Sequence, residues 1–284
     1  MKKNNIQNEQ LIKSHLERIA NILMINGGFL DNPGLYSGEM GLVIFFFHYA
    51  KFTNNELYRN FSYELIEKIQ ENIHIETPIN YKDGLAGIGS AFEYLSQERF
   101  IKADTDELLE DFDDRIFSIR NIPHLSAEDI ISISYYALWR ISGSRSKRKI
   151  LLTNILPPVV KAMEEWRSNH KLTHSMIDYL KESVEIESGV GLVNDNPMTY
   201  PSRLRLICMN KTDVSTSEQS LRFPEIMSGN DILSPFNRDL GLRNGLAGMG
   251  MTLLAEIDND GASITWTSLL QNNFQPQINE SVPV

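Results

Sequence analysis

The chain has 284 residues, 42% of them hydrophobic and 23% charged, which is a globular composition and excludes a disordered protein. A net charge of −10, without a basic stripe, excludes a typical nucleic-acid-binding protein, and a single cysteine, Cys208, excludes an intramolecular disulfide. Because the first ten residues lack the apolar run of a secretory signal and no apolar stretch is long enough to cross a bilayer, we expect a cytoplasmic protein that binds no membrane.

The spacing of apolar residues predicts two kinds of helix that alternate along the chain. Helices with one apolar face are expected over 8–24, 56–73, 105–120 and 146–169, the last broken or kinked at Pro157-Pro158. Helices apolar on nearly all sides are expected over 39–51, 85–100 and 127–141. A helix apolar all round is buried, so the alternation predicts an all-α fold with inner helices covered by outer ones. This is typical of an α/α barrel (toroid), with a helical solenoid as the alternative.

The later part of the chain shows less periodicity. Residues 173–184 are typical of a helix, whereas 185–237 are rich in Gly, Pro, Ser and Asn. We interpret 185–237 as a long loop excursion over one mouth of the barrel; the alternatives are two helices hidden in weakly periodic sequence, or an incomplete barrel. No clear linker is present, so we predict one domain, residues 1–284. The basic run from Arg140 to Lys149 is typical of a solvated turn that leads into a helix, although it could also attract an acidic peptide or a phosphate.

A glycine motif recurs three times without gaps, each time at the start of an apolar helix. Its segments are Ser37-Gly-Glu-Met-Gly-Leu-Val-Ile-Phe-Phe, Asp83-Gly-Leu-Ala-Gly-Ile-Gly-Ser-Ala-Phe and Asn244-Gly-Leu-Ala-Gly-Met-Gly-Met-Thr-Leu. The matched glycines are Gly38, Gly41, Gly84, Gly87, Gly89, Gly245, Gly248 and Gly250. The spacing of 46 residues between the first two segments and 161 between the last two predicts intervening units without the motif, with 126–141 as the best candidate.

Glycine weakens a helix by about 1 kcal/mol relative to alanine, so its repeated use requires a gain in packing or conformation. We expect the repeated glycines to let inner helices approach closely. We also expect them to leave backbone N–H groups pointing toward one mouth of the barrel, where an anionic or carbonyl group could bind. A dinucleotide-binding motif is excluded, because the order here is G-x-x-G-x-G, no buried strand precedes it, and it recurs.

The motif Gly84-Leu-Ala-Gly-Ile-Gly, repeated before apolar helices, resembles the lanthionine synthetase C-like family. The run Asp239-Leu-Gly-Leu-Arg-Asn-Gly-Leu-Ala-Gly-Met-Gly-Met-Thr-Leu-Leu-Ala-Glu256 resembles that family's last repeat, and Trp266-Thr-Ser-Leu-Leu270 resembles its closing segment. The resemblance implies an α/α toroid. In the cyclase members it also implies a zinc ion, held by two cysteines and a histidine, that activates a peptide thiolate for addition to a dehydroamino acid.

The zinc ligands implied by this resemblance are missing from the sequence. The chain has no Cys-His-Gly, and Arg243-Asn244 stand before Gly245 in the last repeat. We therefore predict no metal and no other cofactor. Cys208 lies among apolar residues and is interpreted as a buried, inert thiol. His48, on an apolar helix, is interpreted as a core histidine, with metal ligation as the alternative.

The residues beside the glycine helix starts are the candidates for lining a mouth and binding a ligand. They are Tyr36, Glu39, Tyr81, Asp83, Arg243 and Asn244. For Asp83 and Asn244 the simpler interpretation is helix capping, which does not exclude the binding role. No catalytic residue is assigned.

Three functions remain open. The first is a lanthionine synthetase C-like protein without zinc-dependent cyclisation, which binds a peptide or small molecule as an accessory in peptide modification; its partner would be a precursor peptide or a modification enzyme. The second is an α/α-barrel glycoside hydrolase that pairs Asp83 with Glu39 or Asp239. The third is a helical-repeat scaffold for a protein partner, with a broad exposed apolar groove.

Overall fold

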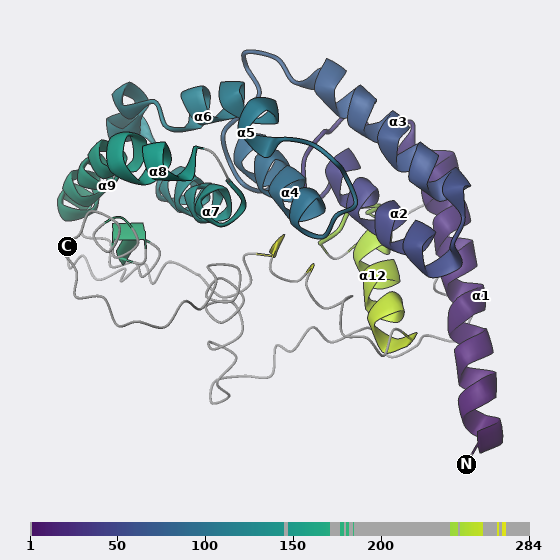
Figure 1. Ribbon diagram of the computed structural model, residues 1–284. Helices are drawn as coiled ribbons and strands as arrows, with labels where there is room; N and C mark the ends of the chain where they lie inside the picture. The colour runs from purple at the N-terminus through teal and green to yellow at the C-terminus, as the bar shows by residue number, and fades with distance from the viewer. Residues whose placement is uncertain are drawn as a thin grey trace, which may run out of the picture. The chain divides into compact units, whose positions relative to one another are not determined.

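The computed structural model describes residues 2–144, 147–170, 177, 178, 180, 181, 184, 239–243, 245–257, 266, 269 and 270 (Figure 1). In these ranges every regular element is a helix and no strand occurs, which confirms the all-α fold. The predictions for 185–237, for Cys208 and for Asn244 concern residues outside these ranges. The chain divides into two compact units, which are described separately below, and the single-domain organisation stays a prediction.

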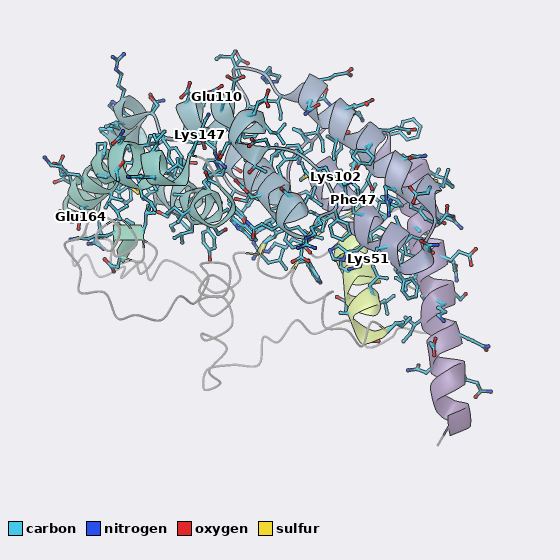
Figure 2. All side chains as sticks on the ribbon, viewed as in Figure 1. Phe47, Lys51, Lys102, Glu110, Lys147 and Glu164 are labelled. Carbon is cyan, nitrogen blue, oxygen red and sulfur yellow. The ribbon has the colours of Figure 1, made fainter. Side chains whose placement is uncertain are left out.

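Unit one comprises Met1–Thr77 and Lys211–Leu270. Its helices are α1 (Lys2–Gly27), α2 (Glu39–Thr53), α3 (Glu56–Asn72) and α12 (Leu246–Ile257). Helix α2 packs against α3, α1 and α12, and α12 also contacts α1. Every residue of α2 from Glu39 to Ala50 is buried, whereas α3 buries a single stripe. Aromatic rings fill the contact between α2 and α3, with Phe47 (labelled in Figure 2) edge-on to Tyr63 at 5.3 Å.

Unit two contains the described helices between Pro78 and Asn210. They are α4 (Leu85–Gln97), α5 (Thr105–Leu108), α6 (Glu110–Ile116), η1 (Ile119–His124), α7 (Ala127–Gly143), α8 (Arg148–Ile150), η2 (Leu151–Ile155) and α9 (Leu156–His170). Helix α4 packs against α7, α5 and α6, and α9 packs against η1. All residues from Leu85 to Leu95 and from Ile130 to Ile141 are buried. The alternation of fully buried and one-faced helices is therefore confirmed in both units.

Two predicted helices are interrupted. The helix expected over 105–120 is divided into α5, α6 and the 3₁₀ turn η1, which contains Pro123. The helix expected over 146–169 contains a π-helical turn, η2, immediately before α9. Pro157 and Pro158 lie in the first turn of α9, which continues through both, so the helix does not break at the prolines themselves. The irregular turn lies just before them, and a kink at this point stays a prediction.

The first and last glycine helices are neighbours within unit one. Helix α12 contacts α2, and the Arg243 N–H donates to the Tyr36 carbonyl oxygen at 3.1 Å. In an open helical solenoid each repeat contacts only its neighbours in sequence. The contact between α2 and α12 joins segments about 200 residues apart, which favours the barrel over the solenoid; closure of the whole ring stays a prediction. Within the described ranges no helix has the length and apolar character needed to span a membrane.

Candidate functional site

The three glycine motifs begin with the same loop conformation, which we call the entry loop (residues 32–38, 78–84 and 239–245). In each loop, the carbonyl six residues before the glycine accepts a hydrogen bond from the N–H just after the glycine. The three bonds are Glu39 N to Asn32 O at 2.8 Å, Leu85 N to Pro78 O at 2.8 Å and Leu246 N to Asp239 O at 2.9 Å. The residue three positions before the glycine is buried in all three loops: Leu35, Tyr81 and Leu242. The sequence repeat is thus a structural repeat.

The entry loop explains why glycine is required at Gly38, Gly84 and Gly245. A Cβ atom at any of the three would overlap the loop's own backbone, at the residues six and four positions earlier. Gly38 and Gly84 have extended φ values of −113° and −121°, so the requirement is for space and not for a left-handed conformation.

The helix-start N–H groups are already paired with the entry loops. Besides the bonds above, Ala247 donates to Leu240 O at 3.1 Å and Gly248 donates to Gly241 O at 3.3 Å. Our expectation that these groups are free to bind an anion was therefore wrong for the N–H groups named here, because the loop satisfies them internally.

The third glycine of the motif serves helix packing. A Cβ atom at Gly89 would press on the Tyr136 ring of α7, and one at Gly250 would press on the Phe45 ring of α2. In both units an aromatic ring of the neighbouring helix lies directly on the backbone at this glycine. The expected close approach of buried helices is confirmed at these two contacts.

Tyr36 and Arg243 are the two candidate mouth residues that the structure brings together. Each stands two positions before its glycine, and the Arg243 guanidinium lies over the Tyr36 ring, 5.1 Å from the ring centre. Tyr36 is buried and Arg243 is half-buried. A guanidinium stacked on an aromatic face is held in place while its edge N–H groups stay available for hydrogen bonds.

Glu39 lies inside unit one. Its side chain is completely buried and forms an ion pair with Lys68 of α3 at 2.6 Å. The Lys68 ammonium also donates to the carbonyl oxygens of Gly28 and Leu30 at 2.8 and 2.5 Å. Burial raises the pKa of Glu39 above its usual value, and the neighbouring Lys68 opposes this rise. The pair fixes the loop after α1 to the start of α2, so Glu39 offers no carboxylate to an open pocket.

Tyr81 and Asp83 belong to the entry loop of unit two. The Tyr81 N–H donates to the Ser132 hydroxyl at 3.0 Å, and the Tyr81 ring lies against that of Tyr135. Asp83 is half-buried, and its N–H donates to the Asn80 side chain at 2.9 Å. The capping interpretation of Asp83 was wrong, because Gly84 is the N-cap of α4 and no side chain caps it. Asn244 lies outside the described residues.

The predicted intermediate unit at 126–141 is present as α7 but begins differently. Ser126 and Asp129 form a reciprocal capping box in which each side chain accepts the other's backbone N–H. A side-chain cap therefore replaces the glycine entry loop at this helix. His48 in α2 is buried, and burial together with nearby Lys51 lowers its pKa to about 3, as expected of a neutral core histidine.

Sequence reasoning missed a buried charged cluster in unit two, which we call the Arg140 cluster (Arg140, Glu93, Asp106, Asp113 and Tyr136). The guanidinium is completely buried and forms ion pairs with all three carboxylates. The interpretation of the basic run as a solvated turn was thus wrong for Arg140, whose side chain is completely buried in the last turn of α7. The available signal was the pair of charged residues, Glu93 and Arg140, inside helices that are otherwise apolar.

Comparison with known protein families finds a match over part of the chain. Residues 30–134 fit the family model described as lanthionine synthetase C-like protein. Over this segment the chain is similar to lanthionine synthetase C-like proteins. No curated protein and no solved structure matches it. The segment includes the entry loops before α2 and α4, and the same loop hydrogen bond recurs before α12, outside the matched residues.

The residues at the last repeat do not fit the zinc ion that the cyclase members use. Arg243 stands at the position where the family's Cys-His-Gly sequence has its cysteine, and its guanidinium is stacked on Tyr36. A guanidinium has no lone pair to offer a metal and repels a cation. Across the described ranges no group of three His, Cys, Asp or Glu residues is arranged to hold a metal ion. Cys208 belongs to the part of the chain that is not described.

Proposed function

We propose that this lanthionine synthetase C-like chain binds a peptide or small molecule as an accessory in peptide modification and does not catalyse zinc-dependent thioether cyclisation. We further propose that Arg243, stacked on Tyr36, receives an anionic group of that ligand. The single observation that supports both parts is the Arg243 side chain at the position where the family's cysteine ligand precedes histidine and glycine.

The surroundings of Arg243 support an anionic ligand. Its backbone is fixed by the 3.1 Å hydrogen bond to Tyr36, and its side chain is half-exposed. Within the described ranges, no Asp or Glu forms an ion pair with it, although the chain has 37 acidic residues. A positioned guanidinium with free N–H edges is well suited to a carboxylate or phosphate, which it can bind through two parallel hydrogen bonds.

The metal content of the purified chain tests the first part of the proposal. After incubation with excess zinc and desalting, we expect well below one zinc per chain by inductively coupled plasma mass spectrometry. Stoichiometric zinc would overturn it. A parallel assay uses a model peptide with one cysteine and one dehydroalanine; we expect its thiol to remain fully open to alkylation after incubation with the zinc-treated chain.

Binding of the same peptide, with a free carboxyl terminus and a fluorescent label, tests the second part. Arg243→Met should weaken the anisotropy-measured affinity by about tenfold, the value of one charge-assisted hydrogen bond. Lys82→Met is the matched control, because Lys82 occupies the same position of the second entry loop but is exposed and paired with Glu128 at 2.5 Å. Equal affinities of the two variants, or equal binding of the C-terminal amide, would contradict the role of Arg243.

The hydrolase alternative loses one of its two carboxylate pairs, because Glu39 is completely buried against Lys68. The other pair, Asp83 with Asp239, joins residues of the two units and stays a prediction, as does the scaffold alternative. Asp239 already has a structural role, since its side chain accepts the Gly241 N–H at 2.8 Å.

A further inference from the structure

The Arg140 cluster has more buried negative than positive charge. One guanidinium of α7 faces three carboxyl groups: Glu93 of α4, Asp106 of α5 and Asp113 of α6. The exposed fraction of these side chains is at most 9%. If all three were ionised, the cluster would have a net charge of −2 away from water, which is strongly unfavourable. One of the carboxyl groups is therefore expected to keep a proton more tightly than usual.

The hydrogen-bond donors of the cluster are unequally divided. Asp113 accepts from Arg140 Nε at 3.0 Å, from Nη2 at 2.8 Å and from the Tyr136 hydroxyl at 2.7 Å. Asp106 accepts from Arg140 Nη2 and from the Lys147 backbone N–H, both at 3.1 Å. Both aspartates thus accept at least two hydrogen bonds from charged or backbone donors in the interior.

Glu93 has the weakest support as an anion. Its Oε1 accepts from Arg140 Nη1, and the Thr105 side chain is a further hydrogen-bond partner. Its Oε2 is buried against Gly143 and has no hydrogen-bond partner within the described ranges. In agreement with this geometry, burial raises the pKa of Glu93 to about 7, with Asp106 adding to the rise and Arg140 opposing it.

The elements that the cluster holds are short. Helix α5 has 4 residues and α6 has 7, lengths that are not stable as isolated helices. Asp106 and Asp113 attach them to Arg140 in the last turn of α7. Near the surface, the ammonium of Lys147 adds a bond to the Asp106 carbonyl oxygen and an exposed ion pair with Glu110, both at 3.0 Å; Figure 2 labels Lys147 and Glu110.

We propose that Glu93 is a proton-responsive switch within unit two. As a neutral acid it lets Arg140 hold Asp106 and Asp113; as an anion it repels both aspartates and competes for the same guanidinium, which loosens α5 and α6 from α4 and α7. The switch does not depend on any ligand, so its test is independent of the proposed function.

Hydrogen–deuterium exchange of the full chain at pH 6 and pH 8.5 tests the switch. After correction for intrinsic exchange, opening of 104–117 should increase roughly tenfold between the two pH values, as linkage requires for a single group of this kind. Glu93→Gln keeps the shape of the side chain but cannot ionise, and should remove the increase. Glu107→Gln, on the exposed face of α5, removes a charge outside the cluster and should behave like the wild type.

A second measurement does not require the variant to fold. Infrared difference spectra of the wild-type chain should show the carbonyl band of a protonated, buried carboxylic acid at pH 6 that is lost by pH 8.5. Absence of that band would overturn the proposal. So would an equal pH-dependent increase in Glu93→Gln, or a loss of the increase in Glu107→Gln, because either result would place the titrating group elsewhere.

Discussion

Replacement of Gly38 by alanine tests the structural reason for the glycine repeat. The new methyl group would overlap the carbonyl oxygen of Asn32 and lie 2.5 and 2.7 Å from the backbone N and O of Gly34. Backbone atoms cannot rotate away as a side chain can, so the loop must move and the Glu39 to Asn32 hydrogen bond must lengthen. Overpacking typically costs about 1–3 kcal/mol and a lost hydrogen bond about 1 kcal/mol. We expect Gly38→Ala to lower the free energy of unfolding by roughly 2–4 kcal/mol.

Gly28→Ala is the matched control, since Gly28 lies ten residues away in unit one and a Cβ atom there would meet nothing within 4 Å. Urea unfolding followed by circular dichroism should place the control within about 0.5 kcal/mol of the wild type. The reasoning fails if Gly38→Ala is as stable as the control. It also fails if Gly38→Ala lowers the free energy of unfolding as expected but Gly84→Ala, with the same geometry in unit two, does not lower it.

Three further predictions concern the buried charges. Lys68→Met should lower the free energy of unfolding by about 2–3 kcal/mol, less than the loss of a fully buried pair because the Lys68 side chain is 30% exposed. Adding Glu39→Gln should restore part of this loss in urea unfolding. A loss below about 0.5 kcal/mol would show that the ion pair contributes little. Arg140→Lys should cost more than about 2 kcal/mol by the same measurement, since one ammonium cannot bridge three carboxylates; full stability would contradict the geometry of the cluster. The pKa of Glu93 rises from 4.5 to about 7 on folding, so between these values the folded chain holds a proton that the unfolded chain has lost. The free energy of unfolding should therefore fall by up to about 3 kcal/mol as the pH rises from 4.5 through 7. Once Glu93 is ionised in both states, this group causes no further fall. Urea titrations at pH 6, 7 and 8.5 should show the last part of this fall, about 1.4 kcal/mol, in the wild type and not in Glu93→Gln, and parallel curves would argue against it.

Much of the fold could be predicted because the local spacing of apolar residues distinguishes a helix buried on all sides from a helix with one buried face. The helix expected over 39–51 appears as α2, with every residue from Glu39 to Ala50 buried, and the one over 56–73 appears as α3, with one buried stripe. The helix expected over 105–120 was predicted poorly, because its apolar spacing does not reveal the interruption at Leu109, where α5 ends and α6 begins.

The candidate site was predicted less completely than the fold. The sequence placed Tyr36 and Arg243 at equivalent positions of two repeats, but only the contact between α2 and α12 stacks one on the other. Glu39 illustrates the opposite case. Its position beside a glycine predicted that it lines a mouth of the barrel, but its side chain is buried in an ion pair with Lys68, 29 residues later in the chain.

By itself, the sequence determined which segments are helical, which helices are buried on all sides, and which glycines are equivalent, since these depend on the spacing of side chains along one element. The tertiary structure alone decided what the glycines contact and which charges neutralise one another. Those outcomes depend on distances between atoms remote in the chain. A buried carboxylate is stable or unstable according to the donors that other helices bring to it.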